Sequence, residues 1–163
     1  MKKLLFIALL LFCSTAIGKT DGVKRDLAPL IRVCEIREMK MTTFTMDNLV
    51  KYLSLIDAPD PKMVISQFIV ETGWFKSKLF TIGNNICGMK MVQKRQTLAT
   101  GTLYGYASFA HWTDSVDDFL LWLKYHNLSN GYFDQVQKKG YSENSQYCQL
   151  VLKVHKQLKI NLA

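Results

Sequence analysis

The chain has 163 residues, 48% of them hydrophobic and 12% aromatic, which is enough for one domain with a packed core and too little for two. Its formal net charge is +8, yet it contains no run of five or more basic residues, which argues against a nucleic-acid-binding protein. No CxxC pair occurs and the three histidines form no ligand-like pair, so neither a metal site nor a cofactor is expected. A monomer is the simplest expectation.

Residues 1–18 have the pattern of a cleaved secretory signal. Two lysines precede an apolar run over residues 4–12, and the segment ends in small residues. The run is too short to span a bilayer. The bulky Phe12 before Cys13 argues against a lipoprotein signal. We therefore expect a mature protein that begins near Lys19, lies in the periplasm or is secreted, and does not stay inserted in the membrane.

The mature chain would keep three cysteines: Cys34, Cys87 and Cys148. An oxidising compartment permits one disulfide among them, and three pairings are open. If one forms, we expect it between Cys34 and Cys148, which lie in the two terminal segments. Cys87 would then stay reduced.

The sequence pattern for a helix directly after the signal is weak. Residues 19–45 hint at a turn or two of helix and are treated as an N-terminal extension, with the domain over residues 46–163. Thr45 is a good N-cap for a helix that continues to Asp57. The apolar residues of this helix recur on one face, so it should pack against the core.

The next helix carries an acid on its apolar face. An Asp-Pro pair at residues 60–61 predicts its start and Gly73 predicts its end. Glu71 continues the apolar stripe of Val64 and Phe68, so its carboxyl should face the core. It is either a structural acid with a buried partner or a general acid whose pKa is raised by desolvation.

Turn and strand signals follow. Asn84 and Asn85 either hold a tight turn through their own backbone or border a site. Residues 86–91 and 103–109 favour strands, with a polar loop at 93–101, so we expect a small hairpin.

The last third of the chain has a helical pattern. Thr113 should cap a long amphipathic helix whose early aspartates, Asp114 among them, favour its positive N-terminal end. A short helix over residues 132–138 and a final one over residues 144–158 should follow. The predicted fold class is mainly α (α+β), with a small β-hairpin lobe.

Four segments together resemble a known family. The runs QFIVETGWFKSK (67–78) and NNICGMK (84–90) resemble the signature of the glycoside hydrolase family 73 glucosaminidases, which cleave peptidoglycan glycan chains. Residues 106–123 resemble that family's strand-to-helix segment, and residues 140–154 resemble its closing motif and last helix. The resemblance covers about residues 46–158. It implies a lysozyme-like helical fold.

The resemblance also assigns a catalytic residue. The acid before the family's Thr/Ser-Gly-Trp triplet is its general acid, which maps onto Glu71. The chain departs from the family in three places. Cys87 stands where an aromatic is usual, Phe109 stands where many members have Tyr, and no acid lies between Thr72 and Thr113.

The implied activity is hydrolysis of the β-1,4 bond after N-acetylglucosamine, which usually needs a second group besides the acid. Either Asp114 or a neighbouring aspartate approaches the bond, or the substrate's 2-acetamido group attacks while the hydroxyl of Tyr104 or Tyr106 orients it. We expect substrate assistance, with Glu71, Tyr106 and Asp114 as the candidate catalytic residues.

The expected partner is a peptidoglycan glycan strand, and its candidate contacts lie in the same motifs. They are Gln67, Trp74, Asn84, Asn85, Lys90 and Tyr104. Two other functions stay open on the sequence. One is a wall-binding domain with little or no activity, which the missing second acid favours. The other is a lytic transglycosylase, which also uses a single Glu but leaves anhydro-sugar products.

Overall fold

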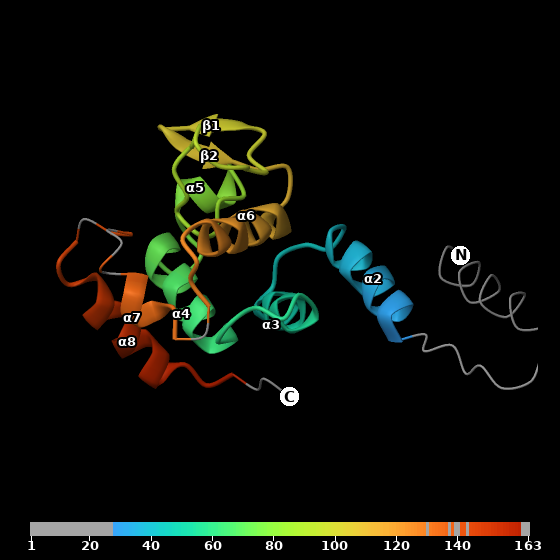
Figure 1. Cartoon of the computed structure of the whole chain (residues 1–163), viewed down its shortest axis with the longest axis horizontal. Coiled ribbons are helices and arrows are strands. Elements are labelled where there is room, and N and C mark those ends of the chain that lie inside the picture. Colours follow the sequence, from blue (N-terminus) through green and yellow to red (C-terminus); the bar gives the residue numbers. More distant parts are fainter. Residues whose placement is uncertain (1–27, 130, 137, 139–140, 143, 161–163) are drawn as a thin grey trace, which may run out of the picture. The chain divides into compact units, whose positions relative to one another are not determined.

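The computed structural model describes residues 28–129, 131–136, 138, 141, 142 and 144–160. The chain divides into two units, residues 1–31 and 32–163, and the cleft discussed below lies in the second. In chain order the elements are α2 (Ala28–Met39), α3 (Met46–Leu55), α4 (Pro61–Thr72), α5 (Lys78–Thr81), β1 (Gly101–Leu103), β2 (Tyr106–Ser108), α6 (Trp112–Tyr125), α7 (Phe133–Val136) and α8 (Tyr147–Gln157) (Figure 1).

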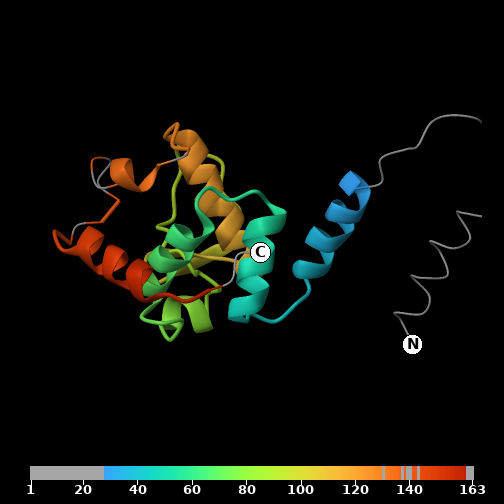
Figure 2. The ribbon, with the colours of Figure 1, turned by 90° about the horizontal axis from the view of Figure 1, so that it is seen from below.

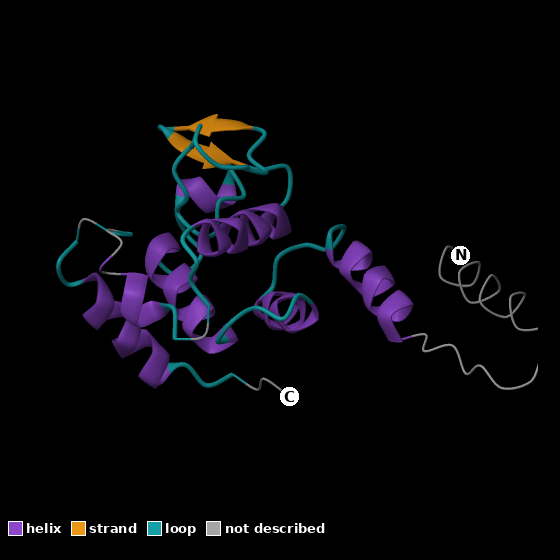
Figure 3. Ribbon diagram, viewed as in Figure 1, coloured by secondary structure: helices purple, strands orange, loops and turns teal. Residues whose placement is uncertain are grey.

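The predicted fold class is confirmed: the domain is mainly helical with a two-stranded antiparallel sheet (Figure 3). The proposed signal at residues 1–18 lies outside the described residues. Within the part of the chain that the structure describes, no helix is both long and apolar enough to cross a bilayer.

The helix boundaries around α4 follow the predicted capping residues. The Thr45 side chain accepts a hydrogen bond from the Asn48 backbone N–H at 3.0 Å, and the Asp60 carboxylate accepts one from Met63 N–H at 3.2 Å. Gly73 ends α4 in the left-handed conformation, with φ of +55°. The Gly73 cap fixes where the last turn of α4, which carries Glu71, comes to an end.

Helix α4 is the centre of the core. Every residue from Met63 to Ile69 is buried, and the helix packs against α3 and α8, with α8 running beside it in Figure 2. Phe68 meets Phe119 of α6 edge to face, with ring centroids 5.3 Å apart. Helix α4 is therefore held by three neighbouring helices, which makes it a rigid support for Glu71.

The predicted strand over residues 86–91 is wrong. The hairpin instead pairs β1 with β2, with Thr102 opposite Ala107. Within residues 86–91, only Lys90 pairs with a strand residue, through an isolated bridge to Tyr106.

The Asn85 side chain explains this difference. Its Nδ2 donates to the carbonyls of Met89 and Ala107, both at 2.8 Å, and its Oδ1 accepts from Met89 N–H at 3.0 Å. A buried amide therefore makes bonds that a strand ladder would otherwise make. The segment can then curve past Glu71 instead of running straight.

The start of α6 differs from the predicted Thr113 cap. The helix begins at Trp112, and His111 is its N-cap, accepting from Thr113 N–H through Nδ1 at 3.3 Å. His111 Nε2 lies 2.8 Å from the Thr42 carbonyl, so this nitrogen carries the proton and Nδ1 is left as the acceptor. The imidazole thus takes the place of the expected hydroxyl.

The expected Cys34–Cys148 disulfide is absent, because all three described cysteines are free thiols. Cys34 is exposed on α2, whereas Cys148 packs partly against the core on α8. Cys87 is buried, and its thiol donates to the Ser115 carbonyl at 3.1 Å. Burial raises the pKa of the Cys87 thiol well above its usual value, which makes it an unreactive core residue.

Candidate active site

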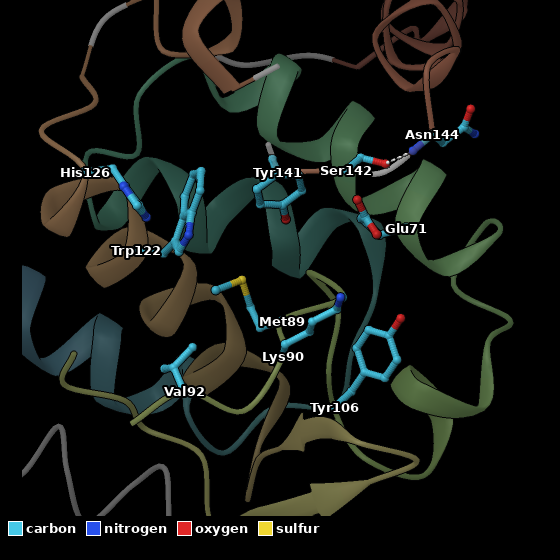
Figure 4. Close-up of a pocket in the computed structure, with 11 residues that line it drawn as sticks. Glu71, Met89, Lys90, Val92, Tyr106, Trp122, His126, Tyr141, Ser142 and Asn144 are labelled. Carbon is cyan, nitrogen blue, oxygen red and sulfur yellow. Dashed lines mark hydrogen bonds between the residues drawn. The ribbon is translucent and has the colours of Figure 1, made fainter. Parts of the chain in front are cut away.

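An open cleft of about 390 Å³ lies where α4 ends, bordered by the segment after α5, by β2 and α6, and by the chain before α8 (Figure 4). Its lining residues are Glu71, Gly88, Met89, Lys90, Val92, Tyr106, Trp122, His126, Tyr141, Ser142 and Asn144. The Glu71 carboxyl, the Lys90 amine and the Tyr106 hydroxyl all face this opening in Figure 4.

The Glu71 carboxyl combines burial with access to the cleft. Desolvation raises its pKa from the ordinary 4.5 to about 7, and a hydrogen bond from Tyr147 opposes part of that rise. A substantial fraction of the Glu71 side chains therefore holds a proton near neutral pH. A carboxylic acid in this state can donate a proton to a bound substrate and take one back.

Gly88 provides the space that the Glu71 carboxyl occupies. Its φ is +65°, and a Cβ at this position would lie 2.6 Å from Glu71 Oε2. Any larger side chain would therefore collide with the carboxyl as well as strain the backbone. The glycine of the NNICGMK run thus has a physical role in the site.

Gln67 lies beneath the cleft and does not line it. It is fully buried on α4 one turn before Glu71. Its side-chain amide accepts from the Tyr132 hydroxyl at 2.6 Å and donates to the Tyr147 hydroxyl at 3.0 Å. Gln67 therefore supports the site from within the core.

An aromatic wall lines the cleft from Trp122 to Tyr141, and neither residue was among the predicted site residues. Tyr141 and Trp122 meet edge to face at 4.9 Å, and Trp122 also contacts His126 at 4.7 Å. The Tyr141 hydroxyl donates to the Cys87 carbonyl at 2.9 Å, which ties the wall to the segment beside Gly88. In Figure 4 Trp122 and His126 lie at the end of the cleft away from Glu71.

Several predicted substrate contacts lie elsewhere. Trp74 is 55% exposed just beyond α4, and Tyr104 is 68% exposed in the hairpin turn; neither lines the cleft. Asn84 Nδ2 donates to the Phe109 carbonyl at 3.1 Å, and Asn85 is buried. Asn85 holds Met89, which lines the cleft, whereas Asn84 holds the chain between β2 and α6. Their structural role was one of the two interpretations of the sequence.

The aspartates of α6 are held by basic residues outside the cleft. Asp114 and Asp117 pair with Lys40 at 3.3 and 2.8 Å. Asp118 is fully buried and forms a bidentate pair with Arg95 at 3.2 and 2.7 Å. These contacts favour structural roles for all three. Among the described residues that line the cleft, only Glu71 carries a carboxyl group, and no described cluster of three His, Cys, Asp or Glu side chains could hold a metal ion.

Comparison with known proteins places the chain in a family. Residues 49–160 match the family model described as mannosyl-glycoprotein endo-beta-N-acetylglucosaminidase. The chain belongs to this glucosaminidase family. A segment of 74 residues is also 35% identical to Protein bax of Escherichia coli (strain K12), which is 45% of this chain but only 27% of that relative.

Two departures from the family pattern lie inside the glucosaminidase domain's core. Cys87 and Phe109 are 0% and 4% exposed, and neither lines the cleft. Phe109 helps to anchor the hairpin, because its backbone N–H donates to the Gly83 carbonyl at 2.9 Å. Both side chains therefore lie in the packing behind the cleft, and neither forms part of the cleft surface.

Proposed function

We propose that this glucosaminidase domain hydrolyses peptidoglycan strands at the β-1,4 bond that follows N-acetylglucosamine, with Glu71 as the general acid. The observation that carries the proposal is the Glu71 carboxyl, which is open to the cleft and has a pKa raised to about 7. Membership in the glucosaminidase family supports a glycan substrate and glycosidase chemistry. The sequence pattern of residues 1–18 supports action outside the cytoplasm.

The proposed first step breaks the bond between the anomeric carbon and the leaving oxygen. Glu71 gives its proton to that oxygen, and the carbonyl oxygen of the 2-acetamido group bonds to the anomeric carbon, which forms a cyclic oxazolinium ion. Water then attacks the anomeric carbon and gives a proton to the Glu71 carboxylate. The ring opens, the acetamido group is restored, and the new reducing end retains its configuration.

Two further residues fit this route. The Tyr106 hydroxyl faces the opening with the Glu71 carboxyl, and we propose that it orients the acetamido group for attack. The exposed Lys90 side chain lines the same cleft, and we propose that it meets the carboxylates of stem peptides. Without its first 18 residues the chain keeps a net charge of +6, since two lysines leave 19 basic residues against 13 acids; this charge favours an anionic wall polymer.

The pH dependence of sugar release should have one main limb. The rate per folded molecule should fall as pH rises through about 7, because Glu71 loses the proton that it must donate. Substrate assistance adds no second catalytic carboxylate, so the rate should stay level between about pH 5 and 6. Initial rates on purified sacculi from pH 4 to 9 measure this. A bell-shaped profile with an acidic limb in that range would indicate a second carboxylate.

The proposal is tested by incubating the purified protein with sacculi and measuring both sedimentation with the sacculi and soluble sugar fragments. We expect binding together with release. Binding without release would contradict hydrolysis and support the wall-binding alternative, which the single lining carboxyl among the described residues favours.

A further inference from the structure

A chain of buried polar side chains runs from the core to the base of Glu71. Tyr132, next to α7, is 1% exposed and its hydroxyl donates to Gln67 Oε1 at 2.6 Å. Gln67 Nε2 donates to the hydroxyl of Tyr147, the first residue of α8, at 3.0 Å. Gln67 and Glu71 stand four residues apart on α4, so they share one face of that helix. The Tyr147 hydroxyl, held by Gln67, is also near enough to the Glu71 carboxyl to lower the pKa of that group.

The donor and acceptor roles in these hydrogen bonds decide whether they favour the ionised or the protonated form of Glu71. An amide oxygen only accepts and an amide nitrogen only donates, whereas a tyrosine hydroxyl has one hydrogen to give. Because Gln67 Nε2 occupies a lone pair of the Tyr147 oxygen, the Tyr147 hydrogen remains for the Glu71 carboxylate. A reversed amide would draw that hydrogen toward Gln67 and would favour the protonated acid instead.

We propose that Tyr147, oriented by Gln67 and Tyr132, is the positioning residue of the general acid: it holds the Glu71 carboxyl against Gly88 and stabilises its ionised form. This inference rests on the proposed function for its catalytic consequence. In that cycle Glu71 must exist as a carboxylate after the first step so that it can take a proton from water. Without the contribution of Tyr147, burial would raise the Glu71 pKa further, and the carboxylate that this step needs would form less readily.

Other titratable groups lie in the same cleft as Glu71 or in the core behind it. Lys90, Tyr106 and His126 line the same cleft. The buried Tyr141 hydroxyl and Cys87 thiol have pKa values that the Glu71 charge helps to raise. Burial keeps those two neutral, and the Tyr147 bond is what opposes the desolvation of Glu71.

The test is a direct titration of Glu71 that needs no substrate. The chain has four glutamates, so protein labelled with ¹³C at the glutamate carboxyl gives four signals, and the one missing in Glu71→Gln belongs to Glu71. Tyr147→Phe should raise the pKa of Glu71 by about one unit, because one hydrogen bond to the charged form is lost. The falling limb of the pH–rate profile should move upward with it.

Matched variants separate this role from packing. Tyr52→Phe deletes the hydroxyl of another buried tyrosine, which donates to Asp117 at 2.7 Å, and should leave the Glu71 titration unchanged. Gln67→Met removes the group that orients Tyr147 and should shift the Glu71 pKa upward by less than Tyr147→Phe. If Tyr147→Phe does not fold, the Glu71 pKa measured in Gln67→Met tests the positioning role instead.

The outcomes are distinct. An unchanged or lowered Glu71 pKa in a folded Tyr147→Phe or Gln67→Met variant would overturn the positioning role. A variant that is merely less stable than the wild type would show a packing role only. If the wild type releases no sugar but the pKa shifts as expected, the proposed function fails and the positioning role stands.

Discussion

Replacing Glu71 with glutamine is expected to lower sugar release from sacculi by about 10²- to 10⁴-fold, or roughly 3 to 5 kcal/mol of activation free energy. Glutamine keeps the volume of the side chain and can still accept a hydrogen bond from Tyr147, but it has no acidic proton to transfer to the leaving oxygen. Binding to sacculi should persist. The measurement is the initial rate of fragment release per folded molecule, with folding checked by circular dichroism.

Two other acid variants are the controls. Asp114→Asn should have a much smaller effect, because Asp114 pairs with Lys40 away from the cleft. Glu143 lies outside the described residues, so Glu143→Gln belongs in the same series. A loss at either position equal to that of Glu71→Gln would replace substrate assistance with a two-carboxylate mechanism.

The same Glu71 variant should change how stability depends on pH. The folded pKa of about 7 exceeds the ordinary 4.5, so the folded state binds more protons between these values and the free energy of unfolding falls as pH rises across that window. Ionising the buried carboxyl costs up to about 3 kcal/mol above pH 7. Glu71→Gln lacks this cost. Denaturant melts at pH 5 and pH 8 should show the variant gaining stability relative to wild type only at the higher pH.

Gly88→Ala should also abolish most of the activity. The new methyl group would lie 2.6 Å from Glu71 Oε2, so the carboxyl must move out of its position beside the glycine. A misplaced acid commonly costs about 10²-fold in rate. The left-handed backbone at φ of +65° adds about 1 to 2 kcal/mol of destabilisation for a residue with a Cβ. Fragment release and denaturant melts measure the two effects separately.

Gly131→Ala is the matched control for the strain that a left-handed backbone places on a residue with a Cβ. Gly131 has φ of +72°, and a Cβ added there would meet no heavy atom within 4 Å beyond its neighbours in the chain. It should lose similar stability and keep full activity. If Gly88→Ala, when folded, releases sugar as fast as Gly131→Ala, then the clearance at Gly88 does not position the acid.

The sequence was sufficient to predict the frame of the site, because local rules govern it. The capping chemistry of Asp60 and Gly73 set the limits of α4, and the apolar stripe through Phe68 placed Glu71 on a buried face. The mainly helical class followed from the same periodicity. These features depend on residues within a few positions of one another.

The rest of the site depends on tertiary contacts that periodicity does not encode. Tyr141 and Trp122 come from distant segments and form one wall only after the helices pack. The strand expected at residues 86–91 failed because the Asn85 amide bonds across the turn. Asp114 could not be excluded from the sequence because its partner, Lys40, lies 74 positions away.

The central claim is that the cleft hydrolyses a glycosidic bond with Glu71 as its acid, and mass spectrometry of the fragments released from sacculi tests it most directly. Hydrolysis after N-acetylglucosamine predicts fragments with a reducing N-acetylglucosamine end, from the wild type and not from Glu71→Gln. Anhydro-sugar ends would contradict it and indicate a lytic transglycosylase, and the same reducing fragments released at an unchanged rate by Glu71→Gln would exclude Glu71 as the acid.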